Sequence, residues 1–137
     1  MRMKSRVDHL VLVSNDVPTT VRFYADLLQG EVVRLAEFEA GDFDYPSVVF
    51  GDWQINVHPV VTPTQPRARD PRPGSGDFCL WFDGAIEPVI EHLGRCGVDI
   101  ELGPVPQDCA GGPAMSVYFR DPDGCLVEFA CRAGAPR

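Results

Sequence analysis

Histidine and glutamate side chains stand in apolar, strand-like surroundings at three places in the sequence. His9 lies within VDHLVLV, Glu128 lies within LVEF, and His58 ends the segment QINVH. An imidazole or a carboxylate buried alone costs free energy, so each needs a metal ion, a hydrogen-bond partner or a ligand. Asn56 precedes His58 by two residues, so strand alternation puts both side chains on one face. These four residues are candidates for metal binding or acid–base chemistry, with a core histidine at position 9 and an exposed strand-end histidine at position 58 as alternatives.

The arginines and cysteines form weaker chemical patterns. Arg67, Arg69 and Arg72 lie in a proline-rich stretch, where they form either a solvated linker or bidentate contacts to a substrate carboxylate, phosphonate or phosphate. The five cysteines are odd in number and never spaced Cys-x-x-Cys. This usage argues against a disulfide framework and a structural zinc site, and it favours a reducing cytoplasm. No cysteine has a histidine nearby in a recognisable nucleophile pattern, so we expect no thiol catalysis.

Apolar periodicity and turn residues predict the same order of elements twice, β-α-β-β-β. The first half has strands at 7–13, 31–36, 46–50 and 54–58 with a helix at 18–29, and the second half has strands at 77–82, 98–102, 115–119 and 125–131 with a helix at 85–96. Cys109 with Gly111-Gly112-Pro113 predicts a loop, either a lid or a plain connection. We therefore predict one α+β domain over residues 1–137, with unit one at about 7–58, a proline-rich connection at 59–76 and unit two at about 77–131.

The two predicted units also align residue by residue. Asp8-His9 falls on Asp77-Phe78, and Asn56 falls opposite Glu128. Because Phe78 then occupies the position of His9, strand alternation predicts a cavity wall made by Phe78 and by the residues that share its face. The expected pocket residues are Asn56, Phe78, Leu80, Phe82 and Tyr118.

The repeated units resemble the vicinal oxygen chelate superfamily of glyoxalases, extradiol dioxygenases, and fosfomycin or bleomycin resistance proteins. The resemblance rests on VDHLVL at 7–12, on FYADLL at 23–28, and on FRDPDG at 119–124 leading to Glu128, and it covers about residues 7–130. It implies two βαβββ units with a pseudo-twofold relation, whose curved mixed sheets enclose a cavity. It also implies that a divalent metal often lies at the floor of that cavity, whereas the substrate does not follow from the fold.

In this superfamily the metal ligands come from the first and last strands of each unit, which correspond here to His9, Asn56, Phe78 and Glu128. Phenylalanine cannot bind a metal ion and an amide is a poor ligand. Since His58 shares the face of Asn56, the expected ligand set becomes His9, His58 and Glu128. Two imidazoles and one carboxylate leave coordination positions open and suit Zn, Ni, Co, Mn or Fe. Asn56 is then expected to orient a ligand.

The resemblance implies three kinds of function. The first is a metal-dependent lyase or isomerase resembling glyoxalase I, in which Glu128 removes a proton beside a carbonyl of a small oxygen-chelating substrate. The second is a 2-His-1-carboxylate dioxygenase. The third is a metal-free resistance protein that binds an antibiotic, for which an acidic protein with an aromatic cavity suits a cationic ligand.

Composition limits the partners of the chain. Its 137 residues carry a formal net charge of −8, which disfavours nucleic acid and anionic membranes as partners. The N-terminus has no separate apolar stretch or cleavage site, so we expect no signal peptide and a cytoplasmic location. Open sheet edges and an apolar inner surface predict a homodimer that binds a small molecule.

Overall fold

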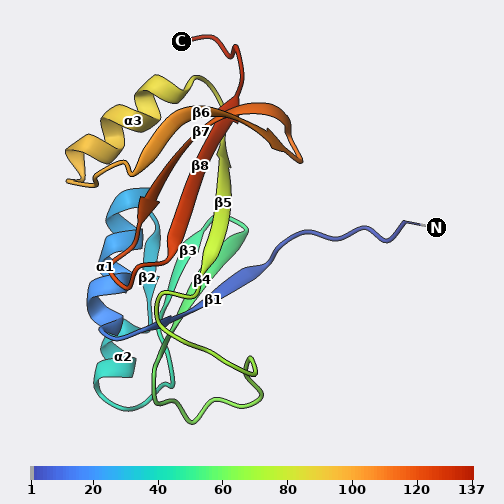
Figure 1. The fold of residues 1–137 in the computed structure, drawn as a ribbon. Coiled ribbons are helices and arrows are strands. Elements are labelled where there is room, and N and C mark those ends of the chain that lie inside the picture. Colours follow the sequence, from blue (N-terminus) through green and yellow to red (C-terminus); the bar gives the residue numbers. More distant parts are fainter. Residues whose placement is uncertain (1) are drawn as a thin grey trace. The chain divides into compact units, whose positions relative to one another are not determined.

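Each half of the chain forms a four-stranded mixed sheet with helices, and both sheets have the same strand order (Figure 1). The structure, a computed structural model, describes residues 2–137. It divides into two compact units, one ending at Pro73 and the other running from Gly74 to Arg137. The α+β class and the repeated order of elements are confirmed.

The first unit is a sheet with α1 packed on one face. Its elements are β1 (His9–Ser14), α1 (Val17–Leu28), β2 (Glu31–Val33), α2 (Leu35–Glu39), β3 (Ser47–Phe50) and β4 (Trp53–Pro59). The strand order is β1-β4-β3-β2, with β1 parallel to β4 and the other pairs antiparallel. Val48, Ile55 and Val57 are fully buried on one side of β3 and β4, the strands that α1 contacts. Their apolar side chains form the core of this unit.

The ends of α1 follow from its sequence. Asp16 precedes the helix and accepts a hydrogen bond from the Thr19 N–H at 3.1 Å, and a proline occupies the first turn. Val21 and Tyr24 recur at helical spacing and are fully buried. Gln29 ends the helix in the left-handed conformation, with φ of 54°.

The second unit repeats this arrangement with α3 in place of α1. Its elements are β5 (Asp77–Phe82), α3 (Ile86–Arg95), β6 (Leu102–Cys109), β7 (Gly112–Arg120) and β8 (Leu126–Arg132), in the order β5-β8-β7-β6 with β5 parallel to β8. The ring of Phe129 lies 4.6 Å from that of Phe82 and 4.8 Å from that of Phe119, between centroids. Leu93 of α3 is fully buried, so aromatic and aliphatic packing holds this helix on its sheet.

One difference from the expected elements lies at the end of β2. The strand expected at 31–36 ends at Val33, because Arg34 adopts a φ of 66° and leaves the extended conformation. The next residues, LAEFE, include good helix formers and make up α2, a helix not expected from the sequence.

A second set of differences lies between α3 and β7. The segment 98–102, expected as a strand, begins at the end of α3, because the Val98 N–H bonds to the Leu93 carbonyl. The strand therefore starts at Leu102. The loop expected around Cys109 is a tight hairpin turn, since Cys109 ends β6 and pairs with Gly112 at the start of β7.

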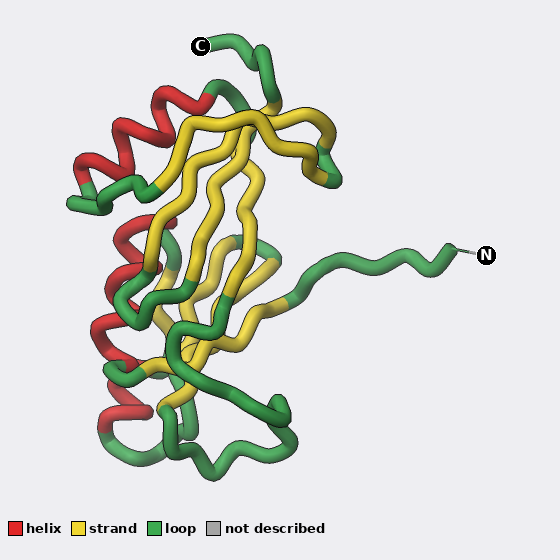
Figure 2. Tube along the Cα trace, viewed as in Figure 1, coloured by secondary structure: helices red, strands yellow, loops and turns green. Residues whose placement is uncertain are grey.

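The connection between β4 and β5 carries the three arginines that were candidates for anion binding. Figure 2 shows residues 60–76 as a loop. Arg67, Arg69 and Arg72 are exposed, and Arg72 Nε donates to Asp70 Oδ1 at 2.8 Å. These arginines therefore match the solvated linker more closely than a built anion site.

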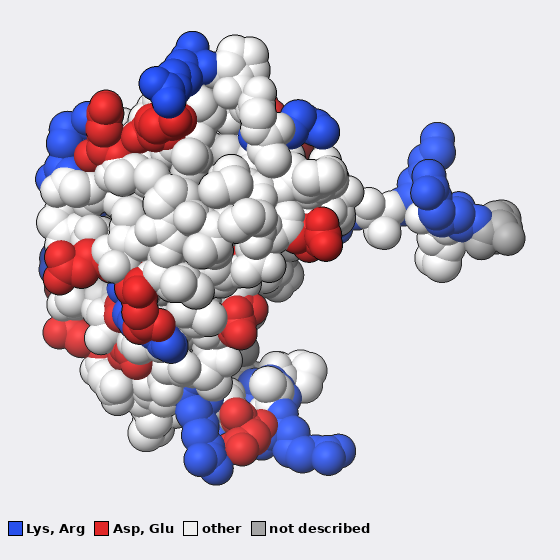
Figure 3. Space-filling model, turned by 45° about the horizontal axis from the view of Figure 1, so that its top comes forward, with Lys and Arg blue, Asp and Glu red and all other residues white. Residues whose placement is uncertain are grey.

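Charged side chains are spread over the surface. Figure 3 shows acidic and basic groups interspersed on the visible face, with basic groups gathered on the N-terminal segment. Within residues 2–137, no helix is both long and apolar enough to cross a membrane.

Candidate functional site

The face of the first sheet opposite α1 carries the candidate nitrogen ligands. In the parallel pair of β1 and β4, His9 is level with Gln54, and Val13 is level with His58. Paired residues in neighbouring strands point to the same side of a sheet, and Asn56 alternates in step with Gln54 and His58. His9, Asn56 and His58 therefore share one face, which we call the imidazole face.

His9 begins β1 and is held by its neighbour. Its side chain is 47% exposed, and its Nδ1 lies 2.9 Å from Asp8 Oδ2. A hydrogen bond from Nδ1–H to a carboxylate leaves the lone pair on Nε2 and fixes the orientation of the ring, as is usual for histidines that bind metals. The exposure excludes the core-histidine alternative, and the hydrogen bond fits His9 for the role of a ligand.

His58 is buried, with only 7% of the residue exposed. Its ring stacks on that of Tyr45, with centroids 4.3 Å apart. Burial lowers the pKa of His58 below its usual 6.5, while the Asp44 carboxylate opposes this shift and His9 adds to it. The ring is therefore neutral near pH 7, which is the state that a metal ligand needs. The alternative of an exposed histidine at the end of a strand is wrong.

Asn56 lies between these histidines in a hydrogen-bond network. Its Oδ1 accepts from Ser47 Oγ at 2.8 Å and from Gln54 Nε2 at 2.7 Å. Both lone pairs of the amide oxygen are thus used within the sheet. Asn56 fits a positioning role, whereas its oxygen does not fit a metal ligand. A pocket of about 460 Å³ adjoins the network and is lined by Val33, Arg34, Asp42, Phe43, Asp44, Tyr45, Ser47, Val49 and Gln54.

The second sheet carries Glu128 on the face that points away from its aromatic core. Glu128 in β8 is level with Cys79 in β5 and with Tyr118 in β7. We call these three residues the carboxylate face. Burial raises the pKa of Tyr118, and the charge of Glu128 and a hydrogen bond to its carboxylate raise it further. Tyr118 therefore stays protonated and can donate a hydrogen bond to Glu128.

The register of β5 corrects the expected cavity wall. Phe78 is level with Val127 and Leu80 with Phe129, both one residue out of step with Glu128. Phe78, Leu80 and Phe82 therefore lie on the aromatic core side of the sheet. The expectation that Phe78 is equivalent to His9 and shares a face with Glu128 is therefore wrong. His9 lies on the face of the first sheet that points away from α1, whereas Phe78 lies on the core side of the second sheet.

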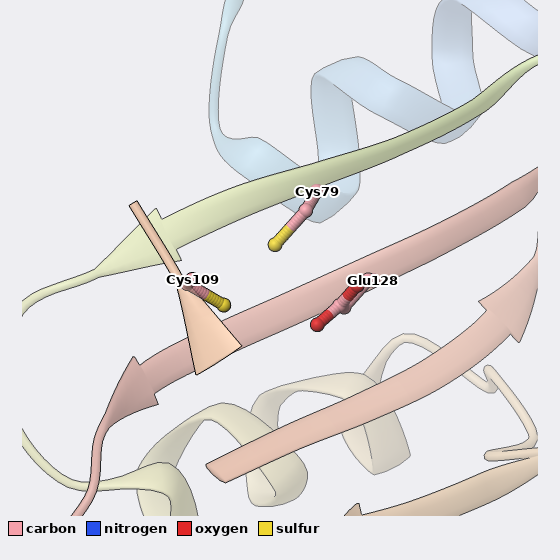
Figure 4. Close-up of side chains that lie close together, drawn as sticks. All are labelled: Cys79, Cys109 and Glu128. Carbon is pink, nitrogen blue, oxygen red and sulfur yellow. The ribbon is translucent and has the colours of Figure 1, made fainter. Parts of the chain in front are cut away.

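Cys79 and Cys109 are neighbours of Glu128 that were not expected from the sequence. One ligand atom from each of the three side chains lies within 4.8 Å of the others. Figure 4 shows them close together, from β5, from the end of β6 and from β8. Strand alternation in DFCLWF puts Cys79 on the other face from Phe78, so a correct register would have predicted Cys79 beside Glu128. The position of Cys109 depends instead on the hairpin between β6 and β7.

The third histidine of the chain, His92, lies in α3. It is half-buried, and its Nε2 is 3.7 Å from the Sγ of Cys96, which is one turn further along the helix. Of the expected site residues, His9, Asn56 and His58 lie on the first sheet, and Glu128 lies on the second with Tyr118. Imidazole nitrogens and a carboxylate oxygen are donors that suit a borderline divalent ion.

Known proteins with similar sequences and structures cover nearly the whole chain. The virulence protein STM3117 of Salmonella typhimurium is 37% identical over 125 residues, which are 91% of this chain and 83% of that protein. Its crystal structure matches with a TM-score of 0.84 over 96% of this chain and 100% of the other. An integron cassette protein from V. cholerae matches with 37% identity and a TM-score of 0.82, covering 96% and 98% of the two chains.

A more distant structure and a family model complete the comparison. Lactoylglutathione lyase from Agrobacterium tumefaciens shares the fold, with 20% identity and a TM-score of 0.69 over 94% and 95% of the two chains. The family model of the Glyoxalase/Bleomycin resistance protein/Dioxygenase superfamily matches residues 6–129. By this match and by its repeated sheets, the chain belongs to the glyoxalase/bleomycin resistance protein/dioxygenase superfamily.

Proposed function

We propose that the chain is a divalent-metal-dependent enzyme of the lyase or isomerase type, resembling glyoxalase I, which acts on a small substrate with two chelating oxygens. Members of the superfamily commonly bind divalent metals. The observation that carries the proposal is the 2.9 Å contact between His9 Nδ1 and Asp8 Oδ2, which leaves Nε2 free to bind an ion. The neutral, buried ring of His58 on the same face supports it.

The candidate ligands are His9, His58 and Glu128. When bound, the ion would act as a Lewis acid toward the substrate oxygens. Glu128 is also the candidate base, since its carboxylate could take a proton from the carbon beside the carbonyl and return it to the neighbouring carbon. Tyr118 donates a hydrogen bond to that carboxylate and would hold it in place, and the Asn56 network would fix the surroundings of His58.

One observation favours a second candidate function, a metal-free protein that binds an antibiotic. The oxygen of Asn56 is already occupied by two hydrogen bonds, so the position where the family pattern has a metal ligand offers none here. Bleomycin resistance proteins belong to the same family as the chain. A 2-His-1-carboxylate dioxygenase would use the same three candidate ligands as the lyase.

Proton exchange tests the enzyme proposal directly. A panel of small α-hydroxy and α-oxo carbonyl compounds is incubated in D2O with the metal-reconstituted protein, and deuterium at the carbon beside the carbonyl is followed by NMR. We expect metal-dependent exchange with at least one compound, and a loss of about a hundredfold in Glu128→Gln, because general-base catalysis contributes about that much or more. Exchange that is equal with and without metal, or unchanged in Glu128→Gln, would refute the proposal.

We also propose that the protein is a homodimer in the cytoplasm. Members of the superfamily often form dimers. In the first sheet, β1 and β2 are the edge strands and carry the exposed apolar residues Val11 (47%) and Val32 (40%). Sedimentation at micromolar concentration is expected to give the mass of a dimer, and a monomer would contradict this. The five free thiols favour a reducing compartment.

A further inference from the structure

Three side chains of the second unit that can bind a metal ion lie close together, and the proposed function uses only one of them, Glu128. The Sγ atoms of Cys79 and Cys109 and a carboxylate oxygen of Glu128 all lie within 4.8 Å of one another (Figure 4). Three strands supply them, because Cys79 and Glu128 are level across β5 and β8, while Cys109 reaches the same place from the end of β6. The cluster is therefore built by the sheet itself and not by neighbours in sequence.

The spacing of these atoms matches the size of a cation site. Three atoms within 4.8 Å of one another always have a common point no further than about 2.8 Å from each, which is 4.8 Å divided by √3. Zinc binds thiolate sulfur at about 2.3 Å and carboxylate oxygen at about 2.0–2.2 Å. Side-chain shifts of about half an ångström or somewhat more would thus bring all three atoms into range, which rotamer adjustments at a half-exposed site can supply.

The surroundings leave room for a further ligand. A pocket of about 380 Å³ is lined by Cys79, Trp81, Gln107, Asp108, Cys109, Ala110, Gly111 and Glu128. Three protein ligands beside an open pocket match the arrangement of zinc sites that keep a position for water or substrate. The indole of Trp81 forms an apolar part of the wall.

The electrostatics of the cluster also favour a cation. Burial, together with the charges of Glu128 and Cys109, raises the pKa of Cys79 to about 12. The two thiols and the carboxylate therefore stand close together. A divalent ion would favour the thiolate state that the neighbouring negative charges oppose.

We propose that Cys79, Cys109 and Glu128 form a binding site for a borderline or soft divalent cation, with zinc as the physiological ion. This site goes beyond the proposed function, since its sulfur ligands differ in chemistry from the imidazoles of His9 and His58. Glu128 is shared with the candidate ligand set of the enzyme. An ion held by the two thiolates would therefore compete for the carboxylate that the proposed catalysis needs.

Cadmium is the probe for the sulfur ligands, because thiolate–Cd²⁺ bonds absorb in the ultraviolet and imidazole–Cd²⁺ bonds do not. The fully reduced protein is titrated with Cd²⁺ in the absence of oxygen. We expect a thiolate charge-transfer band that saturates at one ion per chain. Cys79→Ser and Cys109→Ser should each weaken binding by at least about tenfold and reduce the band. Cys96→Ser, at an exposed cysteine in another part of the second unit, is the matched control and should leave both unchanged.

The histidine variants separate this site from the proposed function. The double variant His9→Ala/His58→Ala should retain the Cd²⁺ band and the stoichiometry. If that variant loses Cd²⁺ while Cys79→Ser and Cys109→Ser keep it, the thiolate site is refuted and the histidine ligands are supported. If the band appears in the wild type but no proton exchange is found with any metal, the thiolate site stands and the enzyme proposal fails.

Protection from alkylation provides a second readout that needs no substitution. The reduced protein is treated with a thiol-specific alkylating reagent, with and without Zn²⁺, and the modified cysteines are identified by mass spectrometry. We expect Zn²⁺ to slow modification of Cys79 and Cys109 together by at least about tenfold, and to leave Cys96 unaffected. Equal modification of Cys79 with and without Zn²⁺ would overturn the proposal.

Discussion

The two sheets have one strand order but carry different chemistry on the faces that point away from their helices. The imidazole face has two histidines and an amide network, while the carboxylate face has Glu128 with a tyrosine and a cysteine beside it. The opposite sides are alike, since Val57 in β4 and Phe129 in β8 are both buried against apolar neighbours. We infer that apolar packing on the side of each sheet that faces its helix fixes strand order and register. The residues on the other side can then differ between the units and carry function.

The largest expected effect tests this division of roles within one strand. Phe129→Ala should destabilise the protein by about 3–5 kcal/mol, because it removes a ring that contacts both Phe82 and Phe119. Glu128→Gln, one residue earlier on the other face, should cost less than about 1 kcal/mol. Urea denaturation measures both. The division fails if the glutamine variant loses as much stability as the alanine variant.

A smaller loss is expected for the amide network of the imidazole face. Asn56→Ala should cost about 1–3 kcal/mol, because the buried Ser47 hydroxyl loses its acceptor and Gln54 Nε2 keeps only the 3.5 Å contact to Ser47 Oγ. Gln54→Ala removes one donor only and leaves the bond between Ser47 and Asn56 intact. Thermal or urea unfolding should therefore rank Asn56→Ala above Gln54→Ala, and the reverse order would show that the network does not support this face.

The helices of the two units differ in their N-terminal caps. The side chain of Asp16 caps α1, whereas α3 follows Ala85, which has no side-chain acceptor. Asp16→Ala should cost about 1 kcal/mol in urea unfolding. Asp16→Asn keeps an acceptor oxygen and should stay within a few tenths of a kcal/mol of the wild type. Equal losses in both variants would assign the effect to the charge of Asp16 and not to the cap.

The smallest expected effect is a pH dependence that belongs to the imidazole face. The folded protein holds His58 with a pKa below the usual 6.5, chiefly because the ring is buried, so the unfolded chain binds protons more readily. The contribution of His58 to stability is complete above about pH 6.5 and is lost as the pH falls toward the folded pKa. Urea unfolding of chelator-treated protein at several pH values should show this loss, and His58→Gln should remove it. An unchanged pH profile in His58→Gln would contradict the assignment.

The repeated fold could be predicted because its signals are local. Val21 and Tyr24 mark the buried stripe of α1, and Gly97 marks the end of α3, so both helices were expected within a residue or two of their bounds. Arg34 gave no such signal, because a positive φ at arginine is uncommon and depends on the surrounding structure. The start of β6 could not be predicted either, because it also depends on the surrounding structure. The hydrogen bond from the Val98 N–H to the Leu93 carbonyl extends the end of α3 into the segment expected as a strand.

In the candidate site, alternation within one strand could be predicted from the sequence, whereas contacts that depend on strand pairing could not. Strand alternation correctly placed Asn56 and His58 on one face, because both lie in β4. Phe78 was assigned to the wrong face, because a repeat aligned by residue type was off by one, and one residue reverses a strand's faces. Cys109 could not be predicted, since its approach to Glu128 depends on the hairpin pairing of β6 with β7.

The central proposal is that the chain binds a divalent metal through His9, His58 and Glu128. Its most direct test is elemental analysis of the purified and reconstituted protein and its variants. In a Cys79→Ser background, which removes the thiolate site, the chain and its His92→Ala variant should each hold about one equivalent of a divalent transition metal. In the same background, His9→Ala and Glu128→Gln should not retain it. Less than about a tenth of an equivalent in the wild type would contradict the claim and favour the metal-free binding protein.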